Sequence, residues 1–184
     1  LIFSSEIVFW GIIIVELVLV WKISKSVDKE SRSLAVTTLM FALFSVLNGA
    51  VLSAIFVVFE STAIIKTFFI TAGTFGVTAA FGYFTKRDLS TIGSMCYMAL
   101  FGLIIASLAN IFFKSAMFDY IVSYIGVAVF IGITAWDSQK IKHQLAAAPD
   151  LSENSQKLAL VGALDLYLDF VNLFLYLLRI FNRR

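Results

Sequence analysis

Three aspartates in the last two hydrophobic stretches of this chain are the residues most suited to chemistry. Asp165 and Asp169 lie within residues 158–181, and Asp137 closes the preceding stretch. An aspartate at the centre of a membrane helix costs roughly 2.5–3.5 kcal/mol, so it normally faces a bundle interior or a water-filled cavity and has a partner there. These three acids are therefore the first candidates for a functional site.

Their spacing places two of the acids on one helix face. Asp165 and Asp169 are four residues apart and Asn172 follows three residues later, so all three project from the same side of a helix. Asp137 is their expected partner, because consecutive spans are antiparallel neighbours and its helix is predicted to continue to about residue 143. Two carboxylates in one site of low dielectric are costly to ionise together, which predicts a proton-dependent latch.

Other interpretations of the acids remain open. Carboxylate oxygens also suit calcium, which takes six to eight oxygen ligands, so Asp137 and Asp169 are candidate calcium ligands. The aspartates could instead accept hydrogen bonds from Ser, Thr or Tyr and only hold helices together. Glu16 is a further acid inside a hydrophobic stretch, with a functional role or a structural pairing to Asn48 or Asn110 as equal alternatives.

The elements that must position these residues are membrane helices. Of the 184 residues, 60% are hydrophobic and 14% are charged, and the mean hydropathy is +0.95. We expect an all-α integral membrane protein, a compact multi-pass bundle forming a single domain over residues 1–184. Its hydrophobic stretches, each about long enough to cross a bilayer core, are six: 6–21, 34–59, 62–84, 93–113, 120–136 and 158–181. Repeated small residues around Gly76 and Gly102 predict close helix contacts there.

Several classes of function are disfavoured. Cys96 is the single cysteine, which excludes an intramolecular disulfide, and His143 is the single histidine, which excludes a histidine-rich metal site. Basic residues are scattered between the spans, a pattern unlike a nucleic-acid-binding face. An intramembrane aspartyl protease is disfavoured because residues 162–165 read GALD and lack the second glycine of the GxGD pattern.

The basic residues instead predict orientation. By the positive-inside rule the cytoplasmic side is the one whose connections, 22–33, 86–92 and 138–157, hold nine basic residues: Lys22, Lys25, Lys29, Arg32, Lys86, Arg87, Lys140, Lys142 and Lys157. The opposite connections hold Lys66 and Lys114. Arg179, Arg183 and Arg184 disagree with this assignment, because they close the chain on the predicted outer side.

Four segments resemble the Bax inhibitor family, also called the transmembrane Bax inhibitor motif family. They are ITAGTFGVTAAFGYFTKRDLS at 70–90, ALFGLIIASLANIFFKS at 99–115, YIGVAVFIGITAWDSQKIK at 124–142 and GALDLYLDFVNLFLYLLRIF at 162–181. The resemblance implies seven transmembrane helices with the last one central, so that one helix precedes Leu1. It also implies a pH-dependent calcium leak through a latch of two aspartates, which correspond here to Asp137 and Asp169.

The chain departs from the family pattern in two places. Asp165 stands where many relatives carry a neutral residue, so the site is expected to titrate as a triad. The resemblance also implies an arginine near the end of the second helix that supports the latch, and the corresponding region here offers Lys22 or Lys25. A lysine would hold a carboxylate less rigidly than an arginine.

The leading hypothesis is a pH-sensitive calcium-leak channel, and not an enzyme, gated by Asp137 and Asp169 with Asp165 as a further sensor. Glu16, Asn172, Lys22 and Lys25 are candidate supports of the ion pathway or latch. The expected partners are the lipid bilayer, calcium ions and protons, with no nucleic acid and no cofactor. The alternative is a non-conducting regulator that binds a membrane protease or another membrane protein. The short polar loops and basic C-terminus suggest a bacterial inner membrane.

Overall fold

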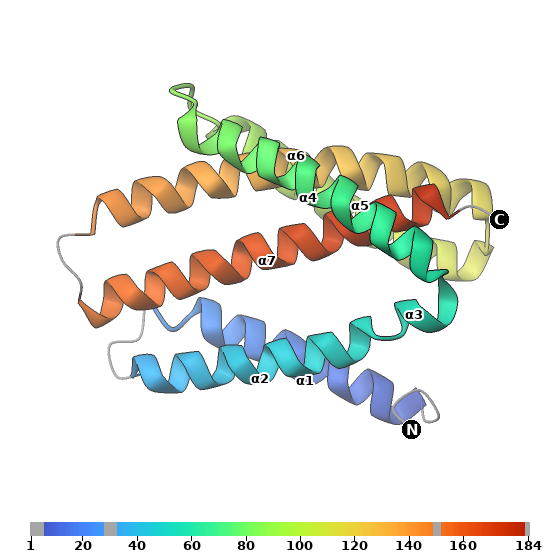
Figure 1. The fold of residues 1–184 in the computed structure, drawn as a ribbon, viewed down its shortest axis with the longest axis horizontal. Coiled ribbons are helices and arrows are strands. Elements are labelled where there is room, and N and C mark those ends of the chain that lie inside the picture. Colours follow the sequence, from blue (N-terminus) through green and yellow to red (C-terminus); the bar gives the residue numbers. More distant parts are fainter. Residues whose placement is uncertain (1–5, 28–32, 149–151, 183–184) are drawn as a thin grey trace. The chain divides into compact units, whose positions relative to one another are not determined.

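The computed structural model describes residues 6–27, 33–148 and 152–182, with side chains from Trp10 onward, and is all helical within these ranges (Figure 1). Its helices are α1 (Glu6–Ser24), α2 (Leu34–Leu52), α3 (Ile55–Val58), α4 (Ser61–Phe84), α5 (Ser90–Phe113), α6 (Ala116–Ala146) and α7 (Glu153–Phe181). The predicted all-α class is confirmed. Lys29, Arg32, Arg183 and Arg184, which entered the orientation argument, lie outside the described residues.

Five segments of the described chain are long and apolar enough to cross a membrane. They are Leu34–Val58, Ser61–Phe84, Ser90–Phe113, Ala116–Ala146 and Glu153–Phe181. The first predicted stretch forms α1, a 19-residue helix that is not among these five. Large apolar side chains remain exposed along the spans, as at Phe112 with 86% exposure and Val77 with 74%. An exterior this apolar is suited to lipid and not to water, so the chain is a membrane protein.

The last two helices extend further than the hydrophobic stretches that predicted them. The sequence contains neither glycine nor proline between residues 133 and 148, so α6 continues to Ala146 before the chain turns. Helix α7 begins at Glu153, five residues before the predicted stretch. Lys140 and Lys142 lie on α6, as its predicted continuation to about residue 143 implies, and Lys157 lies on α7. The two helices therefore leave a much shorter connection than the predicted 138–157.

The chain divides into two compact units, Leu1–Val58 with Leu145–Leu164, and Phe59–Gln144 with Asp165–Arg184. In the first unit α1 packs against α2, and Ser33 caps α2 by accepting a hydrogen bond from the Val36 N–H. The N–H of Leu34 in the same turn donates to the Glu153 carboxylate at the start of α7. These two acceptors satisfy amide groups that a helix start leaves without intrahelical partners.

The second unit has a hydrophobic core built by α5, α6 and α7. Its buried members are Leu103, Val122, Val129, Phe130, Ile133, Leu173 and Leu177. Arg179 near the end of α7 pairs with Asp119 near the start of α6 at 3.9 Å. The two helices are therefore antiparallel, as predicted, and the final helix contributes directly to the core.

Close helix contacts in this unit occur at glycines other than the two predicted. A Cβ at Gly82 of α4 would lie 2.0 Å from the carbonyl oxygen of Ala135 on α6, and one at Gly93 of α5 would meet the Trp136 ring at 2.4 Å. A Cβ at Gly76 or Gly102 would meet no atom within 4 Å among the described residues beyond its own stretch of helix. The prediction for Gly76 and Gly102 is wrong because a small-residue repeat marks a face without specifying which neighbour it meets.

Candidate functional site

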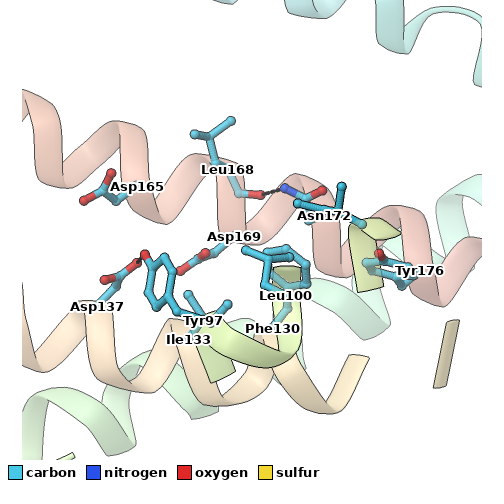
Figure 2. Close-up of a pocket in the computed structure, with 11 residues that line it drawn as sticks. Tyr97, Leu100, Phe130, Ile133, Asp137, Asp165, Leu168, Asp169, Asn172 and Tyr176 are labelled. Atoms are coloured by element: carbon cyan, nitrogen blue, oxygen red, sulfur yellow. Dashed lines mark hydrogen bonds between the residues drawn. The ribbon is translucent and has the colours of Figure 1, made fainter. Parts of the chain in front are cut away.

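The second unit contains a cavity of about 360 Å³ bordered by α5, α6 and α7 (Figure 2). Its lining combines apolar side chains with several polar groups: Tyr97, Leu100, Ile104, Phe130, Ile133, Asp137, Asp165, Leu168, Asp169, Asn172 and Tyr176. The three aspartates predicted from the sequence thus share one cavity. The acids come from two helices, and the third helix contributes the Tyr97 phenol.

Asp137 and Asp169 are the two deeply buried acids of this cavity. Asp137 is 1% exposed and Asp169 is 4% exposed. The Tyr97 hydroxyl lies 3.5 Å from Asp137 Oδ2, to which it can donate a long hydrogen bond. Within the described chain, Asp137 Oδ1 and Asp169 Oδ2 are buried without a hydrogen-bond partner. Burying such an oxygen without a donor is costly, so Asp169 Oδ2 can accept a proton, a water hydrogen bond or a cation. Asp137 Oδ1 can do so alongside the Lys140 ammonium, which lies 3.7 Å away.

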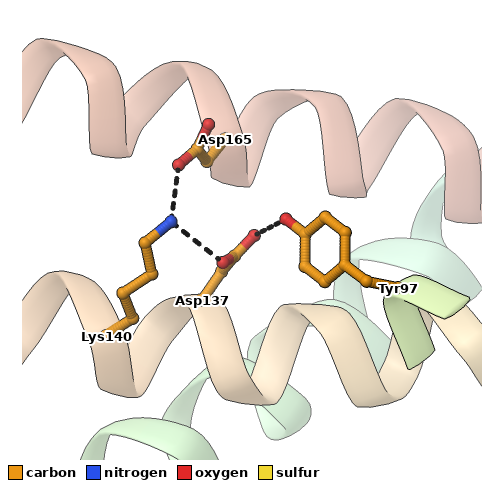
Figure 3. Close-up of polar contacts among 4 residues, drawn as sticks. All are labelled: Tyr97, Asp137, Lys140 and Asp165. Atoms are coloured by element: carbon orange, nitrogen blue, oxygen red, sulfur yellow. Dashed lines mark hydrogen bonds and ion pairs between the residues drawn. The ribbon is translucent and has the colours of Figure 1, made fainter. Parts of the chain in front are cut away.

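Lys140 supplies the positive charge of the site, a role that the sequence argument missed. Its Nζ lies 3.5 Å from Asp165 Oδ2 and 3.7 Å from Asp137 Oδ1. Figure 3 shows the ammonium between the two carboxylates. The same ammonium lies 5.1 Å from the centre of the Trp136 ring. The sequence does contain a signal for this contact, because Asp137 and Lys140 are three residues apart and side chains at that spacing are neighbours on a helix surface. From the sequence, Lys140 is expected on the cytoplasmic continuation of this helix and counts toward orientation, but it is not paired there with an acid.

Asp165 differs from the other two acids in exposure and in its partner. Its side chain is 24% exposed, and its Oδ2 pairs with Lys140 from the facing helix. From the sequence, Asp165 is expected only to titrate together with the other two acids as a triad. The structure adds a cation between Asp165 and Asp137, so the charge of Asp165 is partly balanced.

Asn172 lies one turn beyond Asp169 and lines the same cavity. Its side-chain Nδ2 donates to the Leu168 carbonyl at 2.8 Å, one turn earlier in α7. This bond fixes the orientation of the amide, and the Asn172 Oδ1 is the end of the side chain that remains as an acceptor. Tyr97 was not predicted as a site residue, since one tyrosine among many apolar positions of a span gives no sequence signal.

The remaining predicted residues belong to the first unit, where Glu16 and Lys22 lie on α1 and Lys25 directly follows it. Glu16 is buried and hydrogen-bonds with Asn48, one of the two partners proposed from the sequence. The other proposed partner, Asn110, accepts a hydrogen bond from the Ser115 N–H at the end of α5. Lys25 lies 5.1 Å from the Trp21 ring centre. Support of the latch by Glu16, Lys22 or Lys25 stays a prediction.

The geometry bears on the predicted calcium ligands as well. Across the described residues, no group of three or more His, Cys, Asp and Glu side chains is arranged to hold a metal ion. Asp137 and Asp169 offer at most four carboxylate oxygens, whereas calcium takes six to eight. An ion at this cavity would therefore keep part of its water shell.

Comparison with known proteins agrees with this architecture. Residues 1–184 match the family described as inhibitor of apoptosis-promoting Bax1. Inner membrane protein YbhL of Escherichia coli strain K12 is 47% identical over 186 residues, covering all of this chain and 78% of that protein. An uncharacterized protein of Borreliella burgdorferi is 43% identical with the same two coverages. An uncharacterized membrane protein of Streptococcus pyogenes serotype M1 is 37% identical across 98% of this chain and 76% of the relative.

The match to the family covers the whole chain, and the relatives align over nearly its full length. The helices of membrane-spanning length agree with the multi-pass bundle that the resemblance implied. The chain belongs to the Bax inhibitor family.

Proposed function

We propose that this chain is an inner-membrane protein that lets calcium pass in a pH-sensitive manner, with Asp137 and Asp169 as the gating pair. The inner-membrane location is carried over from the name of the Escherichia coli relative. The observation that carries the proposal is that two buried carboxylates lie on facing helices of one cavity. Each has an oxygen without a hydrogen-bond partner in the described chain, and that of Asp137 is ion-paired with Lys140.

The chemistry of the pair explains why such a path would respond to pH. When both carboxylates are ionised they repel each other across the cavity and attract a divalent cation. When one of them is protonated, it can donate a hydrogen bond to the other and hold α6 against α7. A change in protonation therefore alters both the charge that a cation meets and the packing of the last two helices.

Lys140 gives the path an internal competitor for calcium. An ammonium beside Asp137 and Asp165 partly neutralises the site when no divalent cation is present. Calcium entering the cavity would displace this contact, and the flexible lysine side chain could swing aside and return after the ion had passed.

The gating proposal is tested by calcium flux into liposomes that contain the purified protein. Asp137→Asn and Asp169→Asn should each remove most of the pH dependence of flux, because a proton shared between two acids needs both acids. Asp119→Asn is the matched control, since Asp119 is a half-exposed acid that pairs with Arg179 and does not line the cavity.

Two results would count against the proposal. If both variants keep the pH dependence of the wild type, the pair is not the gate. If well-incorporated wild-type protein gives no flux above empty liposomes at any pH, conduction is excluded. A regulator that binds another membrane protein would then be the better hypothesis.

A further inference from the structure

A second polar cavity, of about 590 Å³, lies beside the connection between α4 and α5, next to the end of α6. Its lining includes four basic or imidazole side chains: Lys86, Arg87, Lys142 and His143. Its size falls in the range of pockets that hold small ligands. None of these residues takes part in the aspartate cavity.

The wall of this cavity is held in place by a buried glutamine. Gln139 on α6 is 5% exposed. Its Oε1 accepts from the Leu89 N–H at 2.9 Å, and its Nε2 donates to the Arg87 carbonyl at 2.8 Å. One side chain thus ties the connection between α4 and α5 to α6 at two points. The basic groups are therefore presented from a fixed backbone.

The charges in the cavity favour an anion. Lys86, Arg87 and Lys142 are cationic, whereas Asp88 is the acid in the lining. The hydroxyl and N–H of Ser90 both donate to Asp88 Oδ1, at 2.6 and 2.9 Å, and they lower the pKa of Asp88, which stays ionised. Three positive charges against one negative charge leave the cavity with a net positive potential.

Lys142 is oriented by its own contacts. Its Nζ donates to the Tyr83 carbonyl at 2.7 Å and lies 4.9 Å from the centre of the Tyr83 ring. An ammonium has three N–H donors, and the Tyr83 carbonyl uses one of them. The ammonium is thus held at the cavity wall with capacity to bind an anionic oxygen.

We expect this cavity at the depth of lipid headgroups, because it adjoins the connection between two helices long enough to span a bilayer. The connection that lines it runs from the end of one helix of membrane-spanning length to the start of the next. The surface of the bilayer must lie near such a connection. Tyr83 and Phe84 at the end of α4 are exposed and stack edge-to-face at 5.1 Å. Aromatic residues at the ends of spans are typical of the membrane interface, where acyl chains and headgroups meet.

From these observations we propose that this basic cavity binds the phosphate group of an anionic phospholipid, with Arg87 and Lys142 as its principal contacts. Basic pockets between membrane helices are suited to anionic headgroups. An arginine can bind two phosphate oxygens at once, whereas a lysine acts as a point charge. The exposed aromatic pair beside the cavity favours a phosphate that carries acyl chains over free phosphate.

The proposal is tested by binding fluorescent phosphatidylglycerol to the purified full-length chain in detergent micelles. Replacing both contacts, in Arg87→Gln/Lys142→Gln, should weaken binding by at least about tenfold, because each basic residue at a membrane surface contributes substantially to anionic-lipid binding. Lys22→Gln/Lys25→Gln removes the same charge from the same predicted side of the membrane and should bind as the wild type does. Arg87→Lys/Lys142→Arg keeps the charge and should retain most of the affinity.

Each other outcome decides against the proposal. Equal loss in the Lys22/Lys25 variant would mean that general surface charge binds the lipid. Equal affinity for phosphatidylcholine would exclude recognition of the net negative charge. Inorganic phosphate could also displace the fluorescent lipid at the same concentration as phosphatidylglycerol does. That result would identify free phosphate as the ligand. If the glutamine variant does not fold, unchanged binding by Arg87→Gln alone would also contradict the assignment.

Discussion

Lys140 lies between two carboxylates, 3.5 Å from Asp165 and 3.7 Å from Asp137. At the scale of single residues this contact sets the charge balance of the aspartate cavity. Asp169, one turn after Asp165 on α7, is the third acid of the cavity. The Tyr97 hydroxyl faces Asp137 from α5. The protonation of the pair therefore depends on one cation and one additional acid, both close enough to act strongly.

Removing the cation and removing the additional acid should move the pH response in opposite directions. Lys140→Gln deletes the positive charge beside Asp137, so the Asp137/Asp169 pair should take up its proton more readily. The pH at the midpoint of the calcium-flux response should therefore rise by roughly one unit. Asp165→Asn deletes a negative charge and leaves Lys140 to Asp137 alone, so the midpoint should fall. Calcium flux in liposomes across a pH series measures both variants.

The charge-retaining Lys140→Arg is the control for this pair of variants and should have a midpoint near that of the wild type. Midpoints that shift in the same direction for Lys140→Gln and Asp165→Asn would contradict the electrostatic account. An unchanged midpoint in Asp165→Asn would identify Asp165 as a structural residue.

At the scale of helices, α6 is held against α4 and α5 at glycines. The approach at Gly82 is the tightest, because a Cβ there would lie 2.0 Å from the Ala135 carbonyl oxygen. That contact is with backbone, which cannot move aside as a flexible side chain can. Since Asp137 follows Ala135 by two residues, the contact also fixes the part of α6 that carries the acid.

Gly82→Ala should therefore destabilise the protein by about 1–3 kcal/mol, the range typical of overpacking. Gly76→Ala is the matched control on the same helix, and it should be neutral or slightly stabilising because alanine is the better helix former. Thermal unfolding of the purified variants in detergent measures the difference. Equal melting temperatures for the two variants would show that the α4–α6 contact relaxes freely.

At the scale of the whole molecule, the remaining prediction is the orientation of the protein in the membrane. Nine basic residues lie on one side in the sequence-based topology, against two in the opposing connections. The side that carries the basic cavity should therefore be cytoplasmic. Arg179, whose position disagrees with this orientation, pairs with Asp119, so its charge is partly compensated within the protein.

Cysteine labelling in intact cells measures this orientation. In a Cys96→Ser background, Asn154→Cys introduces an exposed thiol near the start of α7, on the predicted cytoplasmic side. It should react with an impermeant reagent only after the cells are opened. Phe118→Cys, near the start of α6, is the opposite-side control and should react in intact cells. The reverse pattern would invert the topology.

The sequence by itself determined the class of the molecule and the main acids. Long apolar runs predict membrane helices because helix formation and lipid burial are local properties of a segment. Asp137 and Asp169 were identifiable because carboxylates are rare and costly in such runs. The spacing of Asp165, Asp169 and Asn172 fixed their common face, since helical periodicity is also local.

Only the tertiary structure decided which groups meet across helices. It placed Lys140 beside Asp165, Tyr97 beside Asp137, and Gln139 beside Arg87 and Leu89. It also selected Gly82 and Gly93, instead of Gly76 and Gly102, as points of close approach. These contacts join residues that are 25 or more positions apart, and their formation depends on the rotation and packing of whole helices, which hydropathy and spacing within one segment do not specify.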